Sequence, residues 1–494
     1  MRELRATVQG DAHPRQRGRQ IGAIAALLVG GFGVKMPGAM AAATCPASLA
    51  AAVEGVIEQP QWARSHWGIV VAPPTGEPIY NHNGAIHTIA ASNVKLFTTA
   101  AALLQFGPDF QISTPIYSLG TAPRLDRLHL SGRGDPSLKT ADLTQWAQAL
   151  RSQGVRHIEQ LTVDDAVPAS AQRPDTWEQY DLNFYYGMAV NRLMLNDNAF
   201  QITLLPQGVG EAVRLESDDA IALRQWDWIN QGVTAPDDTP YSMEIRRRFG
   251  TNELTITGEL AANAGRYSSW GMAVFDPTAY FLATLRFALN RAGITVADSA
   301  IAPPPDIAPS TTHLSPTLAS LVHATNQPSN NLYAEALLQQ LGPGEAGLTA
   351  IAVQLSNIGV DSDAYALVDG SGLSRHTLVS PDAIVQLLQA MTQQPPPIFV
   401  PFIQSLPISG TSGTLRRRLT SATVRGQIAA KTGTMTGVSA LSGYLRPSSP
   451  TPLVFSIVVN RTARSVQEQR EAIDAMMEAI ATWQRCQSEH PSSS

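Results

Sequence analysis

A segment early in the chain is apolar on nearly every side of a helix. It begins at Asn93, and its apolar side chains are Val94, Leu96, Phe97, Ala100, Ala101, Leu103 and Leu104. The pair Gly107-Pro108 follows, and glycine before proline ends a helix, so the spacing predicts a helix over 93–106. A helix that is apolar all round is enclosed by other elements. The chain must therefore fold around this segment as a buried central helix.

Lysine is rare in this chain, which draws attention to the few lysines present. Only four of the 35 basic residues are lysines, namely Lys35, Lys95, Lys139 and Lys431. Arginine keeps its proton in proteins, whereas a lysine that is buried or beside another cation can lose its own. Proton chemistry is therefore to be sought at these lysines. The alternative is a compositional bias that left four lysines by chance.

The first 43 residues have the three parts of a secretory signal peptide. Arginines precede an apolar run over 21–34, and alanines at 39–43 offer cleavage sites. We expect an exported protein, periplasmic or cell-wall associated, with an uncleaved N-terminal anchor as the alternative. Cys45 and Cys486, the only two cysteines, would then either form a disulfide or remain two free thiols. No long apolar run follows residue 45, so loose wall or membrane association is the most that we expect.

Turn residues and apolar patterns divide the rest of the chain. Residues 107–309 are predicted to be strand-rich, and the proline-rich stretch 302–309 marks a boundary. Beyond it we expect helices and then strands, with helices at 318–325, 332–341 and 381–391, strands at 428–434, 440–445 and 453–459, and a closing helix at 465–483. Residues 487–494 are predicted to form a disordered tail.

Several classes of function are disfavoured. A formal net charge of -5 argues against nucleic acid as a partner. The ten histidines lack metal-ligand spacing, and no G-x-S-x-G, H-E-x-x-H or G-x-x-x-x-G-K-[ST] motif occurs, so we expect neither a metal nor a cofactor.

Ser92 and Lys95 lie three positions apart at the start of the buried helix, so they project from one face. A serine hydroxyl needs a group that takes its proton, and a desolvated lysine can be that group. This pair predicts a nucleophile beside its base. Chance occurrence of Ser-x-x-Lys is the alternative.

Two further motifs follow in the sequence. Lys431-Thr432-Gly433-Thr434 reads as the middle of a strand, in which Lys431 supplies a cation and Gly433 leaves room for a peptide to lie alongside. Ser329-Asn330-Asn331 offers a hydroxyl and an amide at the start of a helix, although helix capping by Ser329 would explain that serine equally well.

Taken in order, the three motifs resemble the Ser-x-x-Lys, Ser-x-Asn and Lys-Thr-Gly elements of penicillin-recognising serine DD-peptidases and β-lactamases. The separation of 237 positions between Ser92 and Ser329 resembles the long insertion of low-molecular-mass class C penicillin-binding proteins, the D-alanyl-D-alanine carboxypeptidase/endopeptidase family (peptidase family S13). Segments 132–136, 369–375 and 406–415 also look like that family. Ala90-Ala91 departs from it where a proline often stands, and Asn330 where an aspartate often does.

The resemblance implies an α+β fold of the serine β-lactamase/DD-peptidase type, a helix–sheet–helix sandwich with an antiparallel sheet. Residues 44–106 and 310–486 would form this peptidase domain. Residues 107–309 would form the strand-rich inserted accessory region, expected as two small modules.

The resemblance also implies roles at the site. Ser92 would be the acylated nucleophile, Lys95 its base and Ser329 the proton relay to the leaving amine. Asn331, Lys431, Thr432, Gly433 and Thr434 would bind substrate, with the backbone N–H groups of Ser92 and Thr434 as the oxyanion hole. The implied function is a serine-type D-Ala-D-Ala carboxypeptidase, and in addition an endopeptidase in some relatives, that acts on peptidoglycan peptides and is acylated by β-lactams. A β-lactamase or esterase on this fold and a non-catalytic wall-binding protein are the alternatives. Stem-peptide preference, the ligand of the inserted region and oligomeric state are left open.

Overall fold

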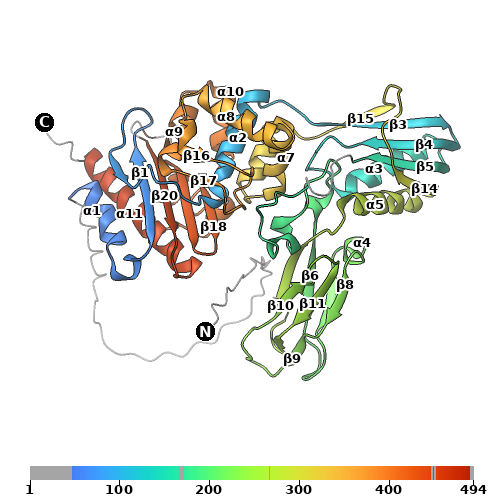
Figure 1. Ribbon diagram of the computed structural model, residues 1–494, viewed down its shortest axis with the longest axis horizontal. Coiled ribbons are helices and arrows are strands. Elements are labelled where there is room, and N and C mark those ends of the chain that lie inside the picture. Colours follow the sequence, from blue (N-terminus) through green and yellow to red (C-terminus); the bar gives the residue numbers. More distant parts are fainter. Residues whose placement is uncertain (1–46, 166–171, 266–267, 447–448, 450–451, 490–494) are drawn as a thin grey trace, which may run out of the picture.

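The protein is described by a computed structural model (Figure 1). The described residues are 47–489, except for 166–171, 266–267, 447–448 and 450–451. The predicted signal peptide and Cys45, and with it the predicted pairing to Cys486, lie outside this range. Among the described residues, no helix combines the length and apolarity needed to cross a membrane.

A five-stranded antiparallel sheet is built from both ends of the chain. Its strand order is β18-β19-β20-β1-β2, and β1 pairs with β20 over the whole of its length. The strands are β1 (His66–Ala72), β2 (Tyr80–His82), β18 (Ile428–Met435), β19 (Val438–Leu445) and β20 (Leu453–Asn460). The pairing of β1 with β20 places the N-terminal part of the domain in the same sheet as β18, which carries Lys431.

Helices cover both faces of this sheet (Figure 1). On one face lie α1 (Leu49–Ile57) and α11 (Val466–Glu489). On the other lies α2 (Lys95–Phe106), surrounded by α6 (Leu318–Asn326), α7 (Asn331–Leu341), α8 (Glu345–Ser356), α9 (Pro381–Thr392) and α10 (Pro396–Gln404). Strand β1 serves both layers because its side chains alternate: Ile69 and Val71 join the cluster under α11, and Val70 and Ala72 join the cluster around α2. The expected helix–sheet–helix sandwich with an antiparallel sheet is confirmed.

Helix α2 is enclosed as its sequence predicts. Its apolar side chains from Leu96 to Leu103 are fully buried, and each large one stabilises the fold by about 1.5–3 kcal/mol. It ends at Gly107, whose φ of 74° favours glycine. It begins at Lys95 rather than Asn93, because Ala91–Val94 form a tighter 3₁₀ turn, η2.

The inserted region begins with a second five-stranded sheet, of order β14-β5-β4-β3-β15 (Figure 1). Its strands are β3 (Ser113–Thr121), β4 (Arg124–Ser131), β5 (His157–Asp164), β14 (Thr295–Ile301) and β15 (Thr311–Leu314). Strand β15 lies just beyond the predicted boundary at 309. The pairs β4/β5 and β5/β14 are parallel, which requires crossover connections, and these contain helices α3 (Thr140–Ser152) and α5 (Pro277–Arg291).

The sequence predicts strands in this region, and neither of these two helices was expected from it. Helix α3 buries only Leu143 and Ala147, which is too narrow an apolar stripe to stand out in the sequence.

Short strands form the remainder of the inserted region. They make sheets β13-β6-β7, β10-β11-β8 and β12-β9, with the short helix α4 (Ala220–Leu223) alongside. The bounds are β6 (Ala199–Leu205), β7 (Arg214–Ser217), β8 (Asp227–Asn230), β9 (Val233–Ala235), β10 (Glu244–Arg247), β11 (Glu253–Thr257), β12 (Glu259–Ala261) and β13 (Ser268–Ala273). One hydrophobic cluster runs through these sheets and the five-stranded one. The division into two modules stays a prediction.

Two short strands, β16 (Tyr365–Ala366) and β17 (Leu378–Val379), enclose a loop that reaches the base of α2. At the C-terminal end, α11 continues through residue 489, three residues into the predicted tail. Residues 490–494 lie outside the described residues.

Candidate active site

Ser92 and Lys95 face one another at the point where η2 passes into α2. In a 3₁₀ turn, side chains three positions apart are eclipsed, and the backbone N–H of Lys95 donates to the carbonyl of Ser92. Lys95 Nζ consequently lies 2.9 Å from Ser92 Oγ. The predicted nucleophile and base are therefore within hydrogen-bond distance.

The backbone before Ser92 is strained and held from two sides. Ala91 has φ 46°, a left-handed conformation that costs a residue with a Cβ roughly 1 kcal/mol or more. A Cβ on Gly372 would lie 2.0 Å from the Ala91 carbonyl oxygen, and one on Gly433 would lie 2.5 Å from that of Ala90. Because these two residues are glycines, strand β18 and the loop between β16 and β17 can pack directly against the backbone that precedes Ser92. Gly433 thus has a packing role, and the expectation that it also leaves room for a peptide beside the strand stays a prediction.

Lys95 is fully buried and makes two other hydrogen bonds. Its Nζ donates to Asn331 Oδ1 at 2.6 Å and to the Ser371 carbonyl at 2.7 Å. Both groups only accept, so they occupy the two N–H bonds of a neutral amine. The lone pair of a neutral Lys95 is then directed at the remaining partner, Ser92 Oγ. This arrangement suits a base that takes the serine proton.

The electrostatic surroundings favour the neutral form of Lys95. Burial lowers the pKa of Lys95 to about 7, against the opposing attraction of Asp369 and Glu335. Burial likewise lowers the pKa of Lys431, and the charge of Lys95 lowers it further. The two ammonium groups thus disfavour one another, so a neutral Lys95 lets Lys431 keep its proton more readily.

Ser329 and Lys431 form a second serine–lysine pair. Lys431 is fully buried, and its Nζ donates to Ser329 Oγ at 2.7 Å and to the Thr432 carbonyl at 2.9 Å. Ser329 has φ 65°, so its backbone is also left-handed. It does not cap α7: Asn330 does, because its Oδ1 accepts the Tyr333 N–H. The capping explanation for Ser329 is therefore replaced by its contact with Lys431.

The inserted region contributes to this site. Asn331 Nδ2 donates to the Tyr186 carbonyl at 2.7 Å, from the 3₁₀ turn η5 (Tyr185–Gly187). A carbonyl can only accept, so it holds the amide with Oδ1 turned toward Lys95. The Trp177 indole donates to Asp369, which ties the same region to the loop between β16 and β17.

Thr432 and Thr434 lie on the edge strand β18, and their hydroxyl groups bond with residues outside the two serine–lysine pairs. Thr432 Oγ1 donates to Thr414 Oγ1 at 2.8 Å, and Thr434 Oγ1 accepts from Arg470 of α11 at 3.3 Å. The alternation expected of a strand holds here, since Gly433 packs against the start of η2 and Lys431 contacts Ser329, just before α7.

The sequence analysis left residues 369–375 without a role and did not single out Glu335. In the structure the Ser371 carbonyl is a partner of Lys95, and Glu335 accepts backbone N–H groups from the same loop. A carbonyl contact has no side-chain signature. Glu335 could have been found, because it lies four positions after Asn331 and so shares its helix face.

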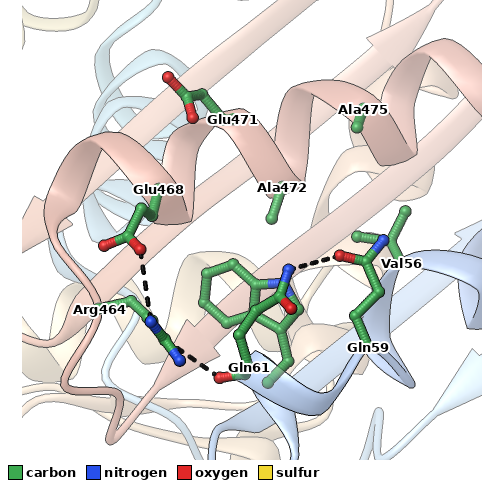
Figure 2. Close-up of a pocket in the computed structure, with 9 residues that line it drawn as sticks. Val56, Gln59, Gln61, Arg464, Glu468, Glu471, Ala472 and Ala475 are labelled. Carbon is green, nitrogen blue, oxygen red and sulfur yellow. Dashed lines mark hydrogen bonds and ion pairs between the residues drawn. The ribbon is translucent and has the colours of Figure 1, made fainter.

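A separate pocket lies between α1 and α11, on the sheet face away from α2 (Figure 2). It lies against Trp62 and includes Gln61, Arg464 and Glu468; Arg464 donates a hydrogen bond to the Gln61 carbonyl and forms an ion pair with Glu468. None of the predicted site residues lines it. Within the described residues, no cluster of three or more His, Cys, Asp or Glu side chains is placed to hold a metal ion.

Comparison with known proteins decides the family. The model of the D-Ala-D-Ala carboxypeptidase 3 (S13) family matches residues 49–483. The chain belongs to this family. The resemblance read from the three motifs is confirmed, and with it the expectation of a peptidase.

Relatives of this S13 peptidase support the same assignment. It is 32% identical to a D-alanyl-D-alanine carboxypeptidase of Actinomadura sp. (strain R39), over 83% of this chain and 80% of that one. It is 27% identical to a penicillin-sensitive carboxypeptidase A of Dictyostelium discoideum, over 84% and 86%. The crystal structure of penicillin binding protein 4 (dacB) from Haemophilus influenzae matches with a TM-score of 0.75 at 24% identity, over 88% of this chain and 98% of that one, which shows a shared fold.

Proposed function

We propose that this S13 peptidase removes the terminal D-Ala from peptidoglycan stem peptides through an acyl-enzyme on Ser92. One observation carries the proposal: the fully buried Nζ of Lys95 lies 2.9 Å from Ser92 Oγ, and its two other contacts are acceptors. A lysine held in this way has its lone pair available for the serine proton.

In the first step, Ser92 Oγ attacks the carbonyl carbon of the penultimate D-Ala while Lys95 Nζ takes the hydroxyl proton. The backbone N–H groups of Ser92 and Thr434 stabilise the oxyanion that forms. The intermediate collapses when the C–N bond breaks, and the proton that Lys95 took passes through Ser329 Oγ to the leaving amine, which leaves Lys95 neutral again. Ser329 Oγ lies 2.7 Å from Lys431 Nζ. Terminal D-Ala departs and the acyl group stays on Ser92.

In the second step, water attacks the ester carbonyl and gives its proton to the same base. The C–O bond to Ser92 breaks while Lys95 returns that proton to Ser92 Oγ, which releases the shortened peptide and restores both the hydroxyl and the neutral base. Without this step the acyl-enzyme accumulates, which is what we expect with a β-lactam that acylates Ser92 as a substrate mimic.

Substrate would lie along β18, the edge strand next to both serines. The Asn331 side chain would release the Tyr186 carbonyl and bind the substrate amide in its place. The hydroxyls of Thr432 and Thr434 would bind the terminal carboxylate, with Lys431 and the nearby Arg470 supplying positive charge. Gly433 would support these contacts by keeping β18 close to the nucleophile.

The N-terminal sequence supports export to the periplasm or cell wall, where peptidoglycan is found. Endopeptidase cleavage of D-Ala cross-links uses the same acylation chemistry, so the proposal extends to it as a second peptide substrate.

The test is intact-protein mass spectrometry of the mature chain after brief exposure to benzylpenicillin. We expect one adduct on the parent protein and on Ser320→Ala, a control at an exposed serine of α6, and none on Ser92→Ala. Release of D-Ala from a D-Ala-D-Ala pentapeptide should follow the same pattern. An adduct that persists on Ser92→Ala would contradict the proposal. Consumption of penicillin without any adduct would favour a β-lactamase.

A further inference from the structure

A buried carboxylate lies behind Lys95. Glu335 lies on α7, one turn after Asn331, and only 4% of its surface is exposed. Its Oε1 accepts the Ser371 N–H at 2.7 Å, and its two oxygens share the Gly370 N–H at 3.0 and 3.1 Å. Its hydrogen bonds thus go to the loop whose carbonyl contacts Lys95.

We propose that Glu335 is a positioning residue for the base. Through the loop peptides it holds the Ser371 carbonyl against Lys95 Nζ, and its negative charge sets how readily Lys95 loses its proton. This inference rests on the proposed function, since it takes Lys95 as the base for Ser92.

The hydrogen bonds form a continuous chain of rigid peptide groups. Glu335 holds the N–H of Gly370 and of Ser371, and Asp369 Oδ1 accepts the N–H of Gly372 at 3.2 Å. That last N–H belongs to the same planar peptide group as the Ser371 carbonyl. Two buried carboxylates therefore fix three successive peptides, and the carbonyl of the third accepts the N–H of Lys95.

Of the two carboxylates, Glu335 is the one to test. Asp369 also accepts from Ser374, Thr377 and the Trp177 indole, so changing it would disturb the whole loop and its tie to the inserted region. Glu335 bonds with two neighbouring loop residues, Gly370 and Ser371: it accepts both of their peptide N–H groups and also interacts with the Ser371 hydroxyl.

The charges around Glu335 predict the sign of the effect. Lys95 faces it from α2, Asp369 faces it from the loop, and Lys431 of β18 acts in turn on Lys95. Burial and the neighbouring Asp369 raise the pKa of Glu335 to about 7. As an anion, Glu335 raises the pKa of Lys95 and so limits the lowering that burial causes. Removing the charge should therefore lower the pKa of Lys95 further.

The test is the rate of benzylpenicillin acylation between about pH 5 and pH 9 for Glu335→Gln. The amide offers one oxygen in place of two, and its NH₂ group cannot accept a peptide N–H. We expect the plateau rate to fall by about tenfold and the midpoint of the acid limb to move down by roughly half a unit to one unit.

A matched control is Asp219→Asn in the inserted region. Asp219 likewise accepts two backbone N–H groups, those of Ile221 and Ala222, but it lies at the start of α4. We expect it to change neither plateau nor midpoint. If Glu335→Gln does not fold, Glu335→Asp replaces it, and it should lower the plateau while the retained charge keeps the midpoint near that of the parent.

Two outcomes would overturn the inference. One is a midpoint for Glu335→Gln equal to that of the parent, because a purely structural role lowers the rate without moving the titration. The other is a plateau equal to that of the parent. Failure of the proposed function is distinguished by Ser92→Ala: an adduct on that variant removes the basis of both proposals, whereas its absence leaves a negative result specific to Glu335.

Discussion

The site contains two buried serine–lysine pairs, and their difference assigns their roles. Both lysines are fully buried, with their amines 2.9 Å from Ser92 and 2.7 Å from Ser329. Lys95 also meets two acceptors and lies near two carboxylates, whereas the charge acting on Lys431 is that of Lys95. Burial alone therefore does not define a base. The acceptors that occupy the N–H bonds direct the lone pair, and the carboxylates adjust the proton affinity.

The largest expected effect comes from removing one lysine or the other. Lys95→Met should slow benzylpenicillin acylation by about a thousandfold or more, because the serine loses its base. Lys431→Met is the matched change at the second pair and should slow it by roughly ten- to a hundredfold, since it removes charge and the contact to Ser329 but not the base. Stopped-flow acylation rates measure both. Equal losses of acylation rate in the two variants would contradict the different roles assigned to the two serine–lysine pairs.

A smaller effect separates the two serines. Ser329→Ala should lower D-Ala release from a peptide by about a hundredfold, because the leaving amine loses its proton relay. Adduct formation on Ser92 should survive and be visible by mass spectrometry. Absence of the adduct after prolonged exposure to penicillin would mean that Ser329, too, is required to activate the nucleophile.

The smallest effect tests the contribution of the inserted region. Trp177→Phe removes the N–H that Asp369 accepts at 3.0 Å in a buried position, which should cost about 1–2 kcal/mol of unfolding free energy and slow acylation by less than about tenfold.

Trp226→Phe is its control, because Trp226 is also buried and donates to a carbonyl, that of Ala273, inside the inserted region. It should lower the melting temperature comparably and leave acylation unchanged. An equal loss of acylation in both variants would mean that the tie from Trp177 to the loop has no special effect on the site.

The sequence predicted the elements whose signals are local and strong. Helix α2 is apolar all round, β18 to β20 are short apolar runs, and the rarity of lysine made Lys95 and Lys431 stand out. Those signals led to the sandwich and to the residues that the structure brings together. Helix α3 was missed because it buries only two side chains.

Contacts made by the backbone could not be predicted. The carbonyls of Ser371 and Tyr186 orient Lys95 and Asn331, yet any side chain could stand at such a position. The close approach of Gly433 to the Ala90 carbonyl could not be predicted either, since Ala90 lies more than 300 residues away in the chain. Long-range packing of this kind depends on the completed fold.

The central claim is that Lys95 is a neutral amine near neutral pH, and the rarity of lysine makes this directly measurable. With side-chain-labelled lysine, the mature chain should give NMR signals from Lys95, Lys139 and Lys431 alone. The Lys139→Arg variant identifies the signal of Lys139, which is half-exposed and paired with Asp197, because that signal disappears from the spectrum. We predict that the Lys95 signal titrates with a midpoint near pH 7, consistent with its pKa of about 7. A Lys95 signal that remains that of an ammonium above about pH 9 would contradict it.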